Sequence, residues 1–214
     1  MLSLFKKPRF NRDKPVSLAD CHARRLAVYE RELGEREHTF LAPGDSRIDV
    51  HAFGRDFATD CEEGSDDGYV LLTNGMSEQR MAVPAQAEAK PRAELMWYIR
   101  EATPEISTTL RWLASLPSID STWFGFGHRV PMPEPPVPGT DFRTFLFLTP
   151  IITPDQHIAE ALSIAGDPVE ILTVNLISDR EVGLIKNEGL DAFLDLLDEN
   201  DYPSIFDPAR RSYV

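Results

Sequence analysis

Cysteine and long apolar runs are scarce in this sequence of 214 residues. Its two cysteines, Cys21 and Cys61, form no C-x-x-C pair and are too few for a disulfide framework. No stretch approaches the roughly 20 apolar residues that a membrane helix needs. The first residues include lysines and arginines, but no apolar run of about 7–15 residues follows them, as it would in a secretory signal. We therefore expect a cytoplasmic protein with reduced thiols and no membrane contact.

The sequence also contains fewer basic residues than acidic ones. Lysine and arginine total 22 and aspartate and glutamate total 35, so the net charge is −13. This balance argues against binding to nucleic acid, because affinity for phosphates comes from lysine and arginine. Residues 1–36 hold nine basic and five acidic groups, whereas residues 37–214 hold 13 basic and 30 acidic groups. The acidity therefore belongs to the body of the protein. It can steer a basic partner towards the protein, or it can serve only to keep the protein soluble, and the sequence leaves both interpretations open.

Length and composition predict one globular domain. An apolar fraction of 42% supplies enough side chains for a core, and the length fits a single domain with short extensions. We expect a basic N-terminal tail at 1–16, the domain at 17–208 and a C-terminal tail at 209–214.

Helix patterns are marked by start and stop signals. The predicted helices cover residues 17–33, 103–116, 178–186 and 190–197. The first opens with a serine cap and ends at Gly34, and the second opens with Thr-Pro and is expected to stop at Pro117. Ser178 and Glu181 form a capping box at the start of the third.

Strand patterns lie between these helices. The predicted strands cover residues 47–52, 69–73, 93–100, 123–130, 142–148 and 169–176. The prolines of residues 131–138 make that segment extended and exclude it from a central ladder. Strands and helices do not alternate strictly, so the sequence predicts an α+β domain with a mixed or antiparallel sheet flanked by helices.

No catalytic or metal-binding motif is complete. Residues 125–130 begin like a dinucleotide loop, but Val130 stands where the third glycine is required. In an EF-hand register that begins at Asp60, Ser65 takes the glycine position and Leu71 the glutamate position. We predict no catalytic residue, no metal ligand and no cofactor.

A hydrolase or metalloenzyme is the alternative. It would use His51, His128 or His157 with nearby acids, and it predicts that two or more of these histidines converge in one pocket.

Two groups of residues are candidates for contacting a partner protein. They are the acidic residues Asp60, Glu62, Glu63, Asp66 and Asp67 of one loop, and the aromatic residues Trp123 and Phe126. Clustered carboxylates usually form a hydrated loop, and aromatic residues fill cores as well as anchoring interfaces. The sequence leaves both interpretations open.

Seven short blocks in a fixed order carry a resemblance to a known family. They are Arg47–Phe53, Gly68–Glu78, Arg92–Ile99, Arg111–Pro117, Trp123–Val130, Phe142–Leu148 and Val169–Leu176, followed by a helix start at Ile177–Glu181 and by Gly189 before the last helix. In this order they resemble the suppressor-of-fused family over residues 40–200. The matching segment resembles the N-terminal domain of the animal protein of this family.

This resemblance implies a non-catalytic protein-binding module. Single-domain members are similar to bacterial proteins proposed as immunity proteins of polymorphic toxin systems. The resemblance thus implies a bacterial immunity-type protein that binds and neutralises a toxin. The acidic body adds the expectation that this partner is basic and that binding weakens as salt rises.

Overall fold

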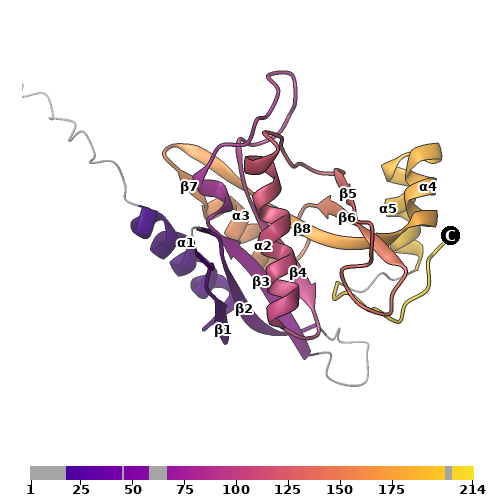
Figure 1. Cartoon of the computed structure of the whole chain (residues 1–214), viewed down its shortest axis with the longest axis horizontal. Coiled ribbons are helices and arrows are strands. Elements are labelled where there is room, and N and C mark those ends of the chain that lie inside the picture. Colours follow the sequence, from indigo (N-terminus) through magenta and orange to yellow (C-terminus); the bar gives the residue numbers. More distant parts are fainter. Residues whose placement is uncertain (1–17, 45, 58–66, 201–203) are drawn as a thin grey trace, which may run out of the picture.

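The computed structural model describes residues 18–44, 46–57, 67–200 and 204–214 (Figure 1). The helices are α1 (Leu18–Leu33), η1 (a 3-10 turn, Met76–Glu78), α2 (Pro104–Ile119), α3 (Thr153–Ala161), α4 (Asp179–Glu188) and α5 (Leu190–Glu199). The strands are β1 (His38–Phe40), β2 (Asp49–Asp56), β3 (Asp67–Asn74), β4 (Arg92–Ile99), β5 (Arg129–Pro131), β6 (Phe142–Leu148), β7 (Ser163–Ile164) and β8 (Asp167–Ser178). None of the described helices combines the length and apolar character needed to cross a bilayer.

The strands form one mixed sheet, which confirms the predicted α+β class. Its order is β1-β2-β3-β4-β8-β6-β5, and β7 pairs with β8 outside this path. β4 and β8 run parallel, and the other pairs of the described strands run antiparallel. The parallel pair lies at the centre of the sheet. Parallel neighbours need a long crossover connection, and helices usually cover both faces of such strands.

Helices cover both faces of β4, so this strand is buried along its whole length. Ala93, Leu95 and Trp97 pack into a core with α2, whereas Met96 and Tyr98 face a second core with α1 and α3. The alternation of residues 93–99 in the sequence therefore separates two buried faces of one strand.

The α4–α5 pair packs over the far end of the sheet from α1 (Figure 1). Leu146 of β6 and Ile177 of β8 enter its core, while their neighbours Phe145 and Leu176 face the α2 core. The pair thus lies on the same face of the sheet as α1 and α3, opposite α2. Between α3 and α5, no described helix covers a stretch of that face of the sheet.

The helix signals are largely confirmed. Gly34 has a φ of 88° and follows α1 directly. The capping box of α4 is present, with Ser178 N donating to Glu181 Oε2 at 2.7 Å. One stop signal is wrong: Pro117 lies inside α2, which continues to Ile119. Pro117 has no N–H to donate to the carbonyl of Leu113, and the helix continues for only two more residues.

Two other predictions need correction. Residues 123–128 form no strand, because Gly127 has a φ of 78° and turns the chain before β5 begins at Arg129. The helix α3 was not predicted, because Ile152 at its N-cap position makes no side-chain cap and few of its nine residues are apolar. Pro131 ends β5 at the edge of the sheet, as expected for a proline-rich segment.

The segment that the sequence assigns to a C-terminal tail packs against α4. Arg210 forms an ion pair of 2.7 Å with Glu181, whose side chain is fully buried. Its guanidinium also lies 4.0 Å from the ring centre of Phe142 and 4.8 Å from that of Tyr213. These contacts attach residues 210–213 to the end of the sheet.

Candidate functional site

The predicted acidic loop lies mostly outside the described residues, and this holds for Asp60, Glu62, Glu63 and Asp66. Asp67, the fifth, is the exposed first residue of β3 and pairs in register with Asp56. A role for this loop in partner binding therefore stays a prediction.

The two predicted aromatic residues lie in different surroundings. Trp123 is half-buried, with its ring centre 4.1 Å from that of His128. Phe126 is 51% exposed and lines a groove that Trp123 does not reach. The structure therefore separates them, because Phe126 lines this groove whereas Trp123 lines a different cavity, and a role of either residue in partner binding stays a prediction.

The groove beside Phe126 occupies the uncovered stretch of the sheet between α3 and α5. Its volume is about 500 Å³, which lies within the range of roughly 300–1,000 Å³ typical of ligand pockets. The floor comes from three central strands, with Tyr98 from β4, Leu148 from β6 and Asn175 from β8. We call this cavity the α5 groove.

The walls of the α5 groove are apolar. Ile151, which is 78% exposed, and Phe126 form one side. Leu194 and Leu197 of α5 form the other side. Large apolar side chains exposed around one cavity are typical of a surface that binds another molecule.

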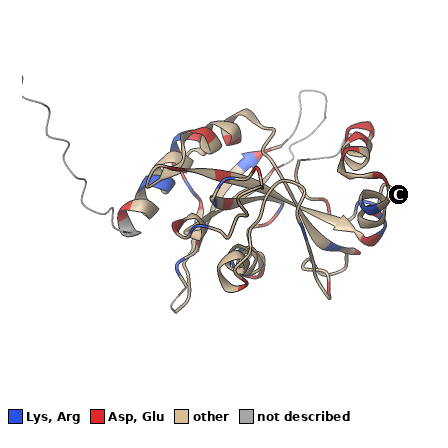
Figure 2. Cartoon of the chain, turned by 90° about the horizontal axis from the view of Figure 1, so that it is seen from above, with Lys and Arg blue, Asp and Glu red and all other residues tan. Residues whose placement is uncertain are grey.

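The rim of the groove on α5 is acidic. Four exposed carboxylates lie on this helix, at Asp191, Asp195, Asp198 and Glu199, and the helix contains no lysine or arginine. Asp198 itself lines the groove. Figure 2 shows acidic residues recurring on the helices at this end of the molecule. The groove therefore combines an apolar interior with negative charge at its edge.

A buried ion pair supports the floor of the groove. Asp155 of α3 is fully buried and receives two hydrogen bonds of 2.8 Å from Arg55 and one from the hydroxyl of Tyr98. Burial, followed by the charge of Asp155, raises the pKa of Tyr98 well above its ordinary value. The hydroxyl thus stays a donor, which fixes the ring that forms the floor.

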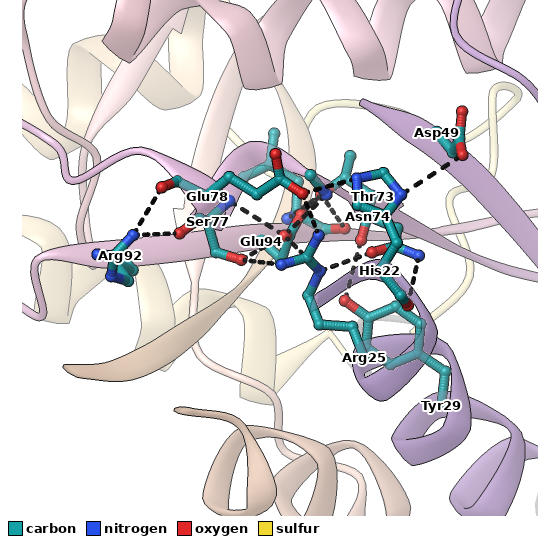
Figure 3. Close-up of polar contacts among 12 residues, drawn as sticks. His22, Arg25, Tyr29, Asp49, Thr73, Asn74, Ser77, Glu78, Arg92 and Glu94 are labelled. Atoms are coloured by element: carbon teal, nitrogen blue, oxygen red, sulfur yellow. Dashed lines mark hydrogen bonds and ion pairs between the residues drawn. The ribbon is translucent and has the colours of Figure 1, made fainter. Parts of the chain in front are cut away.

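A second, more deeply buried polar cluster links α1 to β3, β4 and η1 (Figure 3). Its centre is Glu94, whose side chain is fully buried. Its carboxylate accepts hydrogen bonds from Gly75 N and Ser77 N at 3.0 Å and from the hydroxyls of Thr73 and Ser77 at 2.6 Å. Arg25 Nε lies 3.4 Å away. We call this group the Glu94 cluster.

Arg25 extends the Glu94 cluster from α1. It donates to Asn74 Oδ1 at 2.6 Å and to Glu78 Oε1 at 3.0 Å. His22, one helical turn earlier, contacts the same Glu78 oxygen at 2.8 Å. With its polar groups bonded to one another, the cluster joins α1 to the sheet.

The enzyme alternative required histidines that converge, and they do not. His51 bonds Asn74 and Thr39, His128 makes an edge-to-face contact with Trp123, and His157 contacts Glu32 on the surface. Within the described ranges, no group of three or more histidines, cysteines or acids is placed to hold a metal ion. The geometry on which that alternative depended is therefore missing.

The fold is shared with solved structures. A SUFU (suppressor of fused protein) homolog from Neisseria gonorrhoeae FA 1090 has a TM-score of 0.67 and 18% identity, and the match covers 92% of this chain and 98% of that one. The Sufu-Fu complex has a TM-score of 0.65 and 10% identity, with coverage of 94% and 93%. These identities are low, so the likeness shows the fold.

Drosophila Suppressor of Fused matches with a TM-score of 0.57 and 12% identity. The match covers 98% of this chain but 54% of the Drosophila protein, so this chain spans about half of that protein's length. No curated protein matches the chain.

The mixed sheet and its flanking helices thus define a single-domain protein of the suppressor-of-fused fold. A model of the suppressor of fused protein (SUFU) family matches residues 44–211, which is most of the chain. The protein belongs to this family, as the order of the sequence blocks suggested.

Sequence reasoning reached only part of the candidate site. Of the groove residues it named Phe126, because aromatic residues are common at interfaces. It missed Ile151, Leu194 and Leu197, because an isolated apolar residue in a sequence does not reveal whether a neighbouring helix covers it. The acids of α5 were visible as a charged helix face, but not as the rim of a cavity.

Proposed function

We propose that this protein is a non-catalytic protein-binding module whose α5 groove receives an apolar, basic segment of a partner protein. The observation that carries the proposal is the exposure of Phe126 and Ile151 beside the apolar face of α5. Aromatic and aliphatic residues that fill pockets supply most of the affinity at interfaces. One relative of the same fold is described as the Sufu-Fu complex, and this supports a protein partner.

Charge complementarity supports a basic occupant. Asp198 lines the groove, and three further exposed carboxylates lie on the same helix, in a chain whose net charge is −13. Opposite charges on a partner raise the association rate and align the two surfaces, whereas an acidic segment would be repelled.

The finer proposal is a bacterial immunity-type protein that acts in the cytoplasm and neutralises a toxin. It rests on the resemblance of the sequence to single-domain family members and on the acidic body, because toxins that act on nucleic acids often need basic clefts. Co-expression tests it: a toxin encoded beside this protein should lose its growth inhibition when the protein is present. Undiminished inhibition by every neighbouring toxin gene would remove this finer proposal while leaving the binding module intact.

The first prediction concerns the apolar walls. The double variant F126S/I151S should weaken binding of the partner about 10-fold or more, because each truncated anchor at an interface typically costs more than about 1 kcal/mol. The partner is first captured from the source organism with the tagged wild-type protein at low salt. It is then purified, and its affinity is measured by calorimetry.

The matched control is L41S, which removes an apolar side chain that is 73% exposed and is absent from the groove. It should bind like the wild type. Equal binding by F126S/I151S and L41S would show that the partner uses another surface.

The second prediction concerns the acidic rim. The variant D195K/D198K should weaken the same interaction and should reduce its dependence on salt, because exposed charges act over about 10 Å at 0.1 M ionic strength. The control E88K/E101K changes the net charge equally at two exposed acids outside the groove. If both variants lose affinity equally, net charge rather than the rim is responsible.

A further inference from the structure

A second cavity lies on the opposite face of the molecule, along α2. Its volume is about 800 Å³, which is in the range of roughly 300–1,000 Å³ typical of ligand sites. One wall is α2, and the others are residues 46–48 and residues 75–81, which include η1. We call this cavity the α2 cleft.

The walls of the α2 cleft are held in place by contacts between them. Arg111 of α2 donates to the carbonyls of Ile48 and Phe40, both at 2.8 Å. Ser118 Oγ donates to Gln79 Oε1 at 2.6 Å. The cleft is therefore formed before any ligand arrives, which lowers the entropic cost of binding.

An apolar stripe of α2 borders the cleft without a partner in the described structure. Trp112 is 39% exposed and Ile119 is 69% exposed. They are seven residues apart, so they lie on one face of the helix about 10 Å from each other. Met76 and Met81 are buried beneath the cleft and add apolar surface to its floor.

The charge of the cleft is opposite to that of the chain. Three arginines line it, at positions 47, 80 and 111, and the single carboxylate among the described lining residues is Glu78. Arg25 and His22 contact that carboxylate at 3.0 and 2.8 Å. The negative charge is thereby largely compensated, and the arginines dominate.

The three arginines differ in the hydrogen bonds and ion pairs that they make within the protein. The exposed Arg47 side chain has no hydrogen bond or ion pair with the described part of the chain. Arg80 shares Asp167 with Arg92, at 3.1 and 2.9 Å. Arg111 bonds to carbonyl oxygens rather than to a carboxylate. Positive charge therefore remains for an acidic ligand.

We propose that the α2 cleft binds an acidic, partly apolar peptide segment of a partner protein. Its carboxylates pair with Arg47 and Arg80, and its apolar side chains pack on Trp112 and Ile119. Arginine suits this role because its guanidinium binds a carboxylate through two parallel hydrogen bonds. The occupant has the opposite charge to that proposed for the α5 groove, so the inference is independent of the proposed function.

Synthetic peptides test the proposal directly. Fluorescence anisotropy of the full chain is measured with a labelled peptide that repeats glutamate and leucine. Two reference peptides repeat lysine and leucine, or glutamate and serine. The glutamate–leucine peptide should bind at least about 10-fold more tightly than the glutamate–serine peptide, because both charge and apolar contact contribute. Equal binding of these two acidic peptides would overturn the proposal.

Variants locate the binding site. R47E should lower the affinity for the glutamate–leucine peptide about 10-fold or more, and the fold should persist because Arg47 is exposed and makes no side-chain bond to the described residues. W112A should lower the affinity similarly. The control R129E reverses an exposed arginine that does not line the cleft and should bind like the wild type.

Three outcomes would contradict the assignment. Equal losses of peptide affinity in R47E and R129E would show that the net charge of the protein, and not the α2 cleft, determines binding. If F126S/I151S loses peptide binding while R47E and W112A keep it, the peptide binds in the α5 groove and not in the α2 cleft. A concentration-dependent dimer in sedimentation that R47E abolishes would show that a second copy, not a foreign peptide, occupies the cleft.

Discussion

Replacing Glu94 by alanine is expected to destabilise the protein by about 3–5 kcal/mol, because it leaves buried donors and a buried guanidinium without their acceptor. Glu94 accepts bonds from two backbone amides and two hydroxyls at 2.6–3.0 Å. Arg25, which is 1% exposed, loses the nearest negative charge on its sheet side.

The measurement is the free energy of unfolding from urea titration, with E88A as a matched control at an exposed glutamate. E88A should change stability by less than about 0.5 kcal/mol. The double variant R25M/E94L removes both charges and fills the space with apolar side chains. It should be more stable than the sum of the single changes predicts, because neither charge is left unpaired. A loss below about 1 kcal/mol in E94A would show that the Glu94 cluster is not a stabilising centre.

Lowering the pH from about 7 to about 4 is expected to remove about 2–3 kcal/mol of stability through His51 alone. Its pKa is lowered to about 4, first by burial and then by the positive charge of Arg36. The unfolded chain binds this proton near the ordinary value of 6.5, so between about pH 6.5 and 4 the unfolded state holds more protons. Stability contributed by neutral His51 is therefore present above about pH 6.5 and is lost as the pH falls.

The hydrogen bonds explain why His51 resists protonation. Arg25 Nε donates to Asn74 Oδ1 at 2.6 Å, which directs the amide nitrogen of Asn74 to His51 Nε2 at 3.1 Å. Nε2 must then be an acceptor, so the proton of the neutral ring is on Nδ1, 3.0 Å from Thr39 Oγ1. A second proton on Nε2 would face the amide of Asn74 and break this contact.

The check is the stability of wild type and H51Q measured from pH 7.5 to pH 4. Glutamine does not titrate in this range, so the difference between the two proteins isolates His51. We expect the wild type to lose about 2–3 kcal/mol more than H51Q over this interval. A constant difference across the range would mean that His51 titrates normally.

Local signals predicted much of the fold. The capping box at Ser178, the glycine after α1 and the Thr-Pro start of α2 each depend on contacts within a few residues, so they can be recognised in the sequence. The order of the sequence blocks also led to the family. The helix α3 was missed because it has no side-chain cap and few apolar residues. The turn at residues 123–128 was missed because its backbone bonds to Phe147, which is distant in the sequence.

The site depended even more on distant contacts. Tyr98, Phe126, Ile151 and Leu197 come from four separate segments and meet only because α3 and α5 leave part of one sheet face uncovered. Nothing in the pattern of β4 distinguishes Tyr98, at the floor of a groove, from Met96, which is completely buried.

By itself, the sequence determined the α+β class, most helix and strand positions and the acidic net charge, since these follow from periodicity, local hydrogen bonding and composition. The family came from the resemblance of its ordered sequence blocks to known members. The tertiary structure alone decided which apolar residues stay exposed, and it placed three arginines around a cleft in a chain of net charge −13. The physical reason is that burial and local electrostatic potential depend on which segments pack together, and such contacts join residues far apart in the chain.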